Sequence, residues 1–501
     1  MRETILPAEM KALEQNFMAQ TGVPGAVLME MAAHAVVEAV ERCVPRTVRV
    51  LFLCGPGNNG GDGYAAARLW RMGGGEALVW ELDAPVTPDA QMNRTLLCMQ
   101  GVTPMLPCEK LPEGCGCVVD ALFGTGLTRP LSGAAEALAH LCNTSGLPLV
   151  AVDIPSGLNG TTGETALALH ATETVTFHRV KQGLVLGEGP AYTGRLTVAS
   201  IGIPTAWGSV QGMRILTAAD AARLCVPRPR LSHKGTFGRV VLVVGSEGMA
   251  GAAALCAEAC MRMGAGLTQI ACREHLVPIM QVLVPCATCI PLPERNGILT
   301  AEAPERLMQA MQAADAAAVG CGLGQQADVL PLLRVLLNAA CPVIWDADAL
   351  NLLAREHLSA ASPQSILTPH PGEAARLLGW SIAQVTAKPL EALTALQRKL
   401  GGAALLKGTT TLMTDGQHLA ANITGSPALA QGGSGDVLTG MLAALFAQQK
   451  RLDVEPLTLM QLGVYLHGCA GQKAEAVCGP TAATARDVVE ALRGLWEEQR
   501  S

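Results

Sequence analysis

A glycine-rich loop that leads directly into an apolar run is the strongest chemical signal in this sequence. Residues 432–435 read Gly-Gly-Ser-Gly, and Asp436 precedes the helix-like run 437–445. Such a loop leaves backbone N–H groups unpaired at a helix N-terminus, where the helix dipole also favours negative charge. The pattern predicts an anion site beside a carboxylate that can accept a proton. The alternative for Asp436 is a plain helix N-cap, although the three glycines favour the catalytic interpretation. The predicted anion-binding residues are Gly432, Gly433, Ser434 and Gly435.

Three polar loops follow apolar, strand-like runs in the first half of the chain. Residues 55–63 follow the run 48–54, and Asp120 and Asp153 end two further apolar runs. A helix is expected from about residue 64. Ligands bind beyond the carboxyl ends of parallel strands, so the three loops are expected to share one crevice.

The loop 55–63 matches the dinucleotide-binding pattern, with glycines at its first, third and sixth positions. Three oxygen-bearing side chains crowd it, whereas a pyrophosphate cradle needs bare backbone. Oxygen-rich loops suit a hard cation or a polar substrate instead, and a simple turn is the alternative for this loop alone. The oxygens belong to Asn58, Asn59 and Asp62.

With the segments 57–63, 120–126, 153–157 and 174–178, followed by Lys181, the first 210 or so residues resemble the NAD(P)H-hydrate epimerase family. The resemblance implies a Rossmann-like, three-layer domain over residues 1–213, with Asp153 as the catalytic carboxylate. It implies a potassium site formed by Asn59, Asp120 and Ser156. The implied substrate contacts are Asn58, Asn59, Gly60, Gly61, Asp62, Gly124, Thr125, Gly126, Leu127, Thr128, Arg129, Pro130 and Asp153.

Composition places the chain among globular, cytoplasmic enzymes. It has 501 residues, half of them apolar, and a net charge of −6. That length predicts two or three domains, and the lack of basic excess and of aromatics argues against nucleic-acid binding. We expect no membrane-spanning segment, because no apolar run is long enough. The 17 cysteines suit buried thiols in a reducing compartment, and the pair Cys286 and Cys289 is interpreted as core.

The second half opens after a break in the pattern. Pro227 begins a stiff, charged Pro-Arg-Pro-Arg connector, and the domain boundary is expected just before it. Strand-like runs separated by helical stretches then indicate a second α/β domain. These runs cover residues 267–271, 316–319, 343–345, 366–367 and 403–406.

With the segments 232–238, 346–351, 368–373, 407–408 and 432–436, residues 230–490 resemble the ADP/ATP-dependent NAD(P)H-hydrate dehydratase family. The resemblance implies a ribokinase-like domain over residues 223–501, with Asp436 catalytic and ADP, with magnesium, as co-substrate. For Asp346 and Asp348, cation binding and helix capping stay open. The implied substrate contacts are Ala252, Gly322, His370 and Asp436; the implied nucleotide contacts are Lys407, Gly408, Thr409, Thr410 and Thr411, together with the loop 432–435.

Together the resemblances imply a bifunctional enzyme that epimerises hydrated NADH and NADPH and dehydrates the S epimer. Two alternatives stay open: a small-molecule kinase fused to a nucleotide-binding domain, and a dinucleotide sensor. The expected partners are small molecules, without nucleic acid or membrane. We expect a homo-oligomer.

Overall fold

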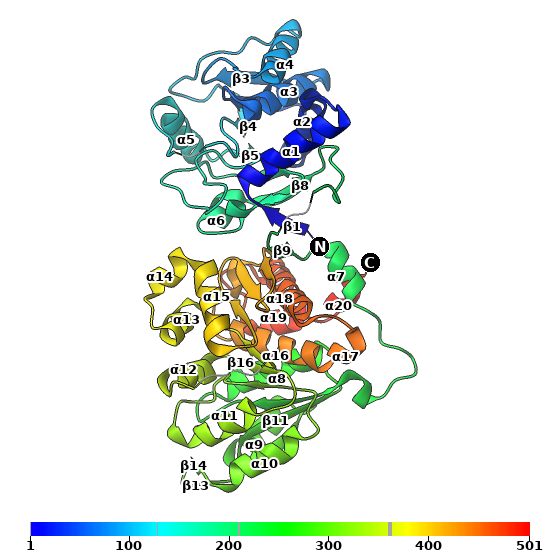
Figure 1. Ribbon diagram of the computed structural model, residues 1–501, viewed down its shortest axis with the longest axis vertical. Helices are drawn as coiled ribbons and strands as arrows, with labels where there is room; N and C mark the ends of the chain where they lie inside the picture. The colour runs from blue at the N-terminus through cyan, green and yellow to red at the C-terminus, as the bar shows by residue number, and fades with distance from the viewer. Residues whose placement is uncertain (1, 128, 209–210, 359–362, 501) are drawn as a thin grey trace. The chain divides into compact units, whose positions relative to one another are not determined.

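Each half of the chain folds around its own, largely parallel sheet (Figure 1). The computed structural model describes residues 2–127, 129–208, 211–358 and 363–500. It divides into two units, Arg2–Met213 and the chain from Arg214 onward. Thr128, a predicted substrate contact, lies outside the described residues. Among the helices of the described residues, none is both long and apolar enough to cross a membrane.

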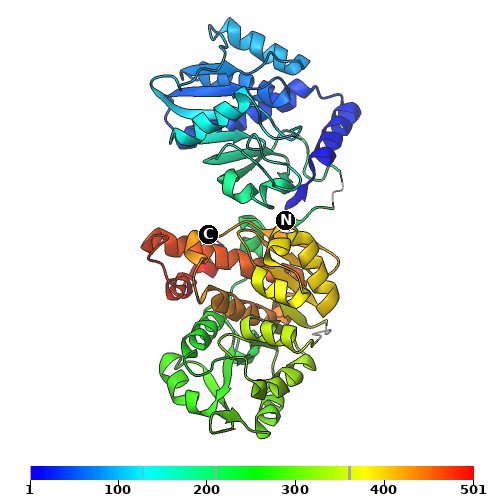
Figure 2. The same cartoon turned by 90° about the vertical axis from the view of Figure 1, so that its left-hand side faces the viewer.

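The first unit is a three-layer sandwich around a parallel sheet of strand order β3-β2-β4-β5-β6-β8. Alternate β2 residues face opposite layers: Phe52 packs with α2 and α3, while Leu51 packs with α5. Figure 2 shows the unit from the side. The α/β prediction is confirmed. The elements are β2 (Arg49–Cys54), β3 (Ala77–Glu81), β4 (Cys115–Ala121), β5 (Leu149–Val152), β6 (Glu173–Phe177), β8 (Arg195–Ala199), α1 (Pro7–Thr21), α2 (Gly25–Cys43), α3 (Asn58–Met72), α4 (Pro88–Met99), α5 (Ala134–Thr144) and α6 (Gly189–Thr193).

Helix α3 starts at Asn58, so the prediction of a loop until about residue 64 was wrong. Local propensity makes the Asn-Asn-Gly-Gly run look like a turn. Packing overrides that propensity, because a Cβ on Gly60 would lie 1.8 Å from the Gly55 carbonyl oxygen. The short strand β1 (Arg2–Ile5), which pairs with β7 (Val180–Lys181), was not predicted either.

The sheet of the second unit runs β12-β11-β10-β15-β16-β17-β18-β19-β20-β9. Its strands are parallel from β12 to β18, after which β19 and β20 pair antiparallel. The unit starts ahead of the connector at Pro227, because β9 pairs with β20. The strands are β9 (Arg214–Ile215), β10 (Arg239–Val243), β11 (Leu267–Arg273), β12 (Thr288–Leu292), β15 (Ala316–Val319), β16 (Val343–Trp345), β17 (Ser365–Leu367), β18 (Ala403–Leu406), β19 (Thr411–Thr414) and β20 (Leu419–Asn422).

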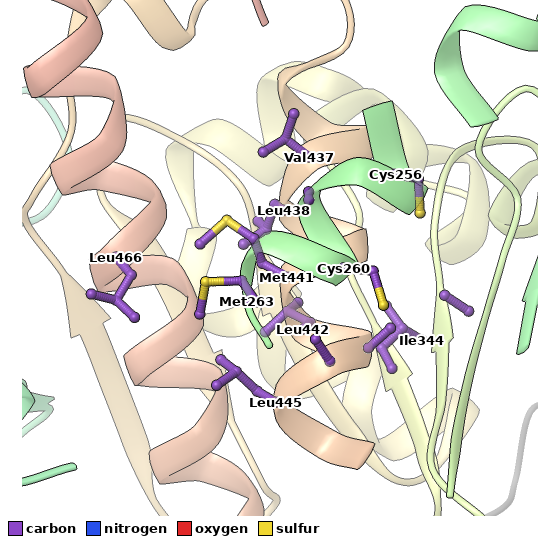
Figure 3. Close-up of a cluster of buried hydrophobic side chains, with 14 of the residues drawn as sticks. Cys256, Cys260, Met263, Ile344, Val437, Leu438, Met441, Leu442, Leu445 and Leu466 are labelled. Carbon is purple, nitrogen blue, oxygen red and sulfur yellow. The ribbon is translucent and has the colours of Figure 1, made fainter. Parts of the chain in front are cut away.

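A buried helix, α16 (Ser434–Ala447), carries the predicted anion loop at its N-terminus. Its apolar side chains pack against α8 and α18 (Figure 3). A Cβ on Gly440 would lie 2.0 Å from the Cys256 carbonyl oxygen, so α16 and α8 approach backbone to backbone. This contact fixes the anion loop against the sheet. The other helices include α7 (Ala218–Leu224), α8 (Ala250–Arg262), α9 (Val277–Leu283), α10 (Glu302–Met311), α11 (Leu330–Leu337), α12 (Ala347–Arg355), α13 (Pro371–Leu378), α14 (Ile382–Ala387), α15 (Pro389–Leu400), α17 (Gln449–Leu452), α18 (Pro456–Cys478), α19 (Ala485–Ala491) and α20 (Leu495–Glu498).

Only one cysteine of the pair near β12, Cys289, packs against the core, so the prediction of a core pair is wrong for Cys286. Cys286 is exposed and Cys289 is half-buried. Strand β12 lies at the edge of the sheet, and an edge strand shows the same local apolar pattern as a central one.

Candidate active sites

The three polar loops of the first unit meet at the carboxyl ends of β2, β4 and β5. Asp120 Oδ2 accepts a hydrogen bond from the Ser156 backbone N–H (2.7 Å), and Oδ1 accepts one from the Ser156 hydroxyl (2.6 Å). Asn59 Oδ1 lies 2.9 Å from the position that a Cβ on Gly124 would take. The structure therefore brings together the residues predicted to share one crevice.

Asp120 is fully buried and receives hydrogen bonds from neutral donors, Ser156 and the Leu122 backbone N–H. Burial raises the pKa of Asp120 to about 6, even though these hydrogen bonds lower it. Close by, Asn59 Nδ2 is buried without a hydrogen-bond partner among the residues that the structure describes. Within the part of the chain that the structure describes, no cation pairs with the Asp120 carboxylate, so a bound cation could supply the missing positive charge; the Asn59 side chain would contribute its Oδ1, because its Nδ2 is a hydrogen-bond donor.

Asp153 is held rigidly at the end of β5. Its φ of +67° lies in the left-handed region, which non-glycine residues rarely adopt. Its backbone N–H donates to the Val175 carbonyl oxygen (2.8 Å). Its Oδ1 lies 2.6 Å from Lys181 Nζ and accepts from the Thr176 hydroxyl (3.2 Å).

Two further carboxyl groups interact with this ion pair. Burial raises the pKa of Asp62 well above its usual value and that of Glu14 to about 7, and the Asp153 charge adds to both shifts. Asp62 was predicted as a substrate contact, whereas Glu14, on α1, was missed. A single glutamate on a helix, away from any strand end or glycine loop, gives no sequence signal.

The remaining predicted contacts of the first unit differ in exposure. Asn58 is exposed at the start of α3, while Gly60 and Gly61 are buried. A Cβ on Gly61 would lie 2.6 Å from Met29 Cε, so this glycine is required by packing. In the loop after β4, Gly124, Thr125 and Leu127 are half-buried, and Gly126, Arg129 and Pro130 are exposed.

In the second unit, the glycine-rich loop lies against a lysine–carboxylate pair. A Cβ on Gly435 would lie 3.3 Å from Lys407 Nζ and 3.5 Å from Asp346 Oδ2. The N-cap of α16 is Gly433, whose φ of +92° suits glycine, so Asp436 lies in the first turn of the helix and is not its N-cap. Loop, lysine and carboxylates therefore share one site.

Asp346 is buried and serves as an anchor for this site. Its Oδ1 lies 2.7 Å from Lys407 Nζ and accepts from the Thr368 hydroxyl, while Oδ2 accepts from the Thr439 hydroxyl (both 2.8 Å). Asp346 occupies the N-cap position of α12, but its side chain makes no capping hydrogen bond to the helix. Burial lowers the pKa of Lys407, but the Asp346 and Glu373 carboxylates outweigh it and raise the pKa above its usual value.

Asp436 is a titratable group in the first turn of α16, directly after the glycine-rich loop. Burial raises its pKa to about 6; a hydrogen bond from the Cys321 thiol opposes the shift, and the Asp346 charge adds to it. One ligand atom each from Cys321, Asp346 and Asp436 lie within 4.8 Å of one another. Asp348 faces the same region and accepts from the Gly324 backbone N–H (2.9 Å).

The predicted substrate contacts of the second unit adjoin this cluster. Gly322, next to Cys321 in the chain, touches α8: a Cβ there would lie 3.1 Å from Ala252 Cβ. His370 is half-exposed and caps α13, accepting from the Gly372 N–H (3.0 Å). Its neighbour Pro369 accepts from the Lys407 N–H (2.9 Å), which places the two loops side by side.

The threonines after Lys407 are not equivalent. Gly408 and Thr409 are exposed, and Thr410 is half-buried. Thr411, the first residue of β19, is buried. Sequence reasoning missed His467, whose Nε2 lies 3.3 Å from Ser434 Oγ. Burial lowers its pKa to about 4, so the ring is neutral at physiological pH. A lone histidine in an apolar helix resembles ordinary core.

Comparison with known proteins covers both units. A family model described as NAD(P)H-hydrate dehydratase matches residues 240–493, and one described as YjeF-related protein N-terminus matches residues 25–183. The bifunctional NAD(P)H-hydrate repair enzyme Nnr of Moorella thermoacetica is 37% identical, over 99% of this chain and 97% of its own. The enzyme of the same name from Vibrio cholerae is 36% identical over 97% of both chains. A ribokinase-like superfamily protein from Enterococcus faecalis V583 aligns with a TM-score of 0.51 and 27% identity, over 59% of this chain and 99% of its own. This likeness confirms the ribokinase-like fold expected for the second half.

Proposed function

The chain belongs to the bifunctional NAD(P)H-hydrate repair enzymes, and from that premise we propose how its two units divide the work. The first unit epimerises the R and S forms of hydrated NADH and NADPH. The second unit dehydrates the S form to NAD(P)H at the expense of ADP. One observation carries this proposal: the glycine loop, Lys407 and an aspartate with a raised pKa share one site.

In the second unit, the substrate hydroxyl must become a good leaving group. We propose that its oxygen attacks the terminal phosphorus of ADP, so that AMP leaves and the hydroxyl proton passes to Asp436. Phosphate then leaves as the neighbouring carbon loses a proton, which restores the nicotinamide double bond. Asp436 suits a general base because it is charged above about pH 6. Backbone N–H groups of residues 432–435 and the Lys407 ammonium would stabilise the phosphate charge.

ADP is proposed to bring its magnesium with it. Asp346 is already engaged by Lys407, Thr368 and Thr439, and the nearby Cys321 thiol is a soft ligand that magnesium disfavours. Phosphate oxygens of ADP and water are therefore the main ligands that this site would offer to magnesium. The remaining contacts to the nucleotide would come from residues 407–411.

In the first unit, inversion at one carbon requires a group that both takes and returns a proton. We assign this role to Asp153, because the left-handed backbone and the contact to Lys181 fix its carboxylate at a strand end. The loops 58–62 and 124–130 would hold the substrate around it.

Asn59, Asp120 and Ser156 are proposed to hold a potassium ion. The buried Asp120 carboxylate, whose hydrogen-bond donors among the described residues are all neutral, supports this assignment. Such an ion would neutralise Asp120 and link the three loops that carry these residues.

The full chain, incubated with hydrated NADPH and either ADP or ATP, tests the proposal. Recovery of the nicotinamide absorbance from a mixture of R and S forms, with AMP as product, is the expected result. Recovery from the S form alone would remove the epimerase assignment, and a phosphorylated product without recovery would indicate a kinase. We further propose a homo-oligomer that acts in the cytoplasm; light scattering and cell fractionation test these two points.

A further inference from the structure

Lys181 is buried to an extent that is unusual for a lysine. Its side chain is 1% exposed, and its Nζ contacts Asp153 Oδ1 (2.6 Å) and donates to the Phe177 carbonyl oxygen (2.9 Å). A buried ammonium is costly unless it is paired with a carboxylate and hydrogen-bonded. The fold therefore holds this charge against one oxygen of Asp153.

The two oxygens of Asp153 differ as a result. Oδ1 contacts Lys181 and accepts from the Thr176 hydroxyl (3.2 Å) and the Phe177 backbone N–H (3.4 Å). Within the described residues, no hydrogen-bond donor reaches Oδ2. Since these contacts to Oδ1 fix the orientation of the carboxylate, Oδ2 is the oxygen left for the substrate.

Other titratable groups face this pair from several elements. Glu14 on α1 and Asp62 on α3 have pKa values raised mainly by burial, to about 7 for Glu14, and Lys181 lowers both. The pKa of His178 falls to about 4, again chiefly because of burial, so its ring is neutral. Arg179 also lowers the His178 pKa, but its guanidinium is paired with a separate carboxylate, that of Glu3 (3.0 Å). Lys181 is thus the cation that contacts Asp153.

We propose that Lys181 is the positioning residue of the first active site: its ammonium holds Oδ1 of Asp153 and leaves Oδ2 to exchange the proton. This inference rests on the proposed role of Asp153. It adds a residue that does not itself touch the reacting carbon.

The test is the pH profile of epimerisation by full-length Lys181→Met, with the dehydratase activity of each preparation used for normalisation. We expect kcat to fall at least about tenfold at pH 7, KM to change less than about twofold, and much of the loss to be recovered by pH 9. Alkaline recovery follows because a carboxylate without its counter-charge ionises only at higher pH. A uniform loss at every pH, or no loss, would overturn the proposal.

Arg42→Met is the matched control. It also removes a cation from a buried carboxylate, that of Glu173 (2.5 Å), which lies at the opposite end of β6 from Thr176 and Phe177. Its epimerisation profile should match wild type. If Asp153→Asn keeps full epimerase activity, the proposed function of Asp153 is wrong. If Lys181→Met keeps full activity and Asp153→Asn does not, the positioning role is wrong and the function of Asp153 stands.

A second measurement decides the case even if Lys181→Met does not fold. Asp153→Asn leaves the buried ammonium unpaired and should lower Tm, and adding Lys181→Met should raise Tm again. A further drop in Tm for the double variant would mean that Lys181 stabilises the fold independently of Asp153, which contradicts the proposal.

Discussion

Replacing Asp436 by asparagine should stabilise the second unit at neutral pH while it removes the dehydratase activity. Burial raises the pKa of this carboxyl from 3.8 to about 6, so the charged form is disfavoured in the folded state. The cost is present above about pH 6 and fades as the pH falls towards 4, because the folded protein then binds the proton more tightly than the unfolded chain. Two pKa units at about 1.4 kcal/mol each set an upper limit of about 3 kcal/mol. Asparagine avoids this cost, and we expect a gain of about 1–3 kcal/mol in unfolding free energy at pH 7.5.

Turnover should change in the opposite direction. Loss of the base should lower kcat about 10²–10⁴-fold with the purified S form. In the wild type, kcat/KM should fall about tenfold per unit below pH 6, as Asp436 takes up a proton. Nucleotide affinity, measured by calorimetry, should stay the same or improve, because the N–H donors of residues 432–435 remain and a negative charge is removed.

Asp487→Asn provides a matched control on another helix. Asp487 also lies in the first turn of its helix, α19, but it accepts from the Thr484 backbone N–H (2.8 Å) and hydroxyl (2.6 Å) as a capping box. Its replacement should lower stability and leave turnover unchanged. If Asp436→Asn destabilises the protein in the same way, the burial argument is wrong, and if it turns over normally, Asp436 is not the base.

Three other changes test the remaining structure. Cutting the chain between Met213 and Arg214 should give two soluble fragments with one activity each, whereas a cut at Arg228 should leave an insoluble second fragment because it removes β9 and α7. In wild type, Tm and the epimerase rate should be higher in potassium chloride than in sodium chloride. Asp120→Asn should remove this difference, as followed by thermal unfolding and rate assays. Gly440→Ala should cost about 1–3 kcal/mol in chemical unfolding, because its Cβ would lie 2.0 Å from the Cys256 carbonyl oxygen, whereas Gly251→Ala in α8 meets open space and should cost nothing.

The parallel strands and the polar residues at their ends could be predicted from the sequence, for a physical reason. Strands buried on both faces are continuous apolar runs, so β15 and β16 appear directly in the sequence. The polar loops follow such runs, which is why Asp120, Asp153 and Lys407 could be placed at the ends of strands from the sequence, and their roles stay predictions. Elements that depend on tertiary packing could not be predicted from the sequence. The first turn of α3 has the composition of a loop, and the two-residue strand β9 forms by pairing with β20.

Residues that modify the sites were harder to find than the residues that form them. Glu14 and His467 belong to helices that pack onto a site from elsewhere in the chain, and no local pattern distinguishes them from ordinary surface or core residues. The pKa of each group depends on burial that only the assembled fold creates, and the neutral His467 ring acts through its contact with Ser434.

Both sites use a lysine to hold a buried carboxylate, but with opposite consequences for catalysis. In the first unit the paired carboxylate, Asp153, is itself the proposed proton carrier, and Lys181 holds the oxygen that does not exchange the proton. In the second unit the lysine is paired with Asp346, and the proposed base is the neighbouring Asp436, whose pKa is raised in part by the Asp346 charge. Lys407 therefore offers a phosphate less net positive charge than a free lysine would, and the backbone N–H groups of the glycine loop must supply most of the stabilisation. The loop lies close enough to the pair for this division of charge: a Cβ on Gly435 would lie 3.3 Å from Lys407 Nζ and 3.5 Å from Asp346 Oδ2, in contact with both partners.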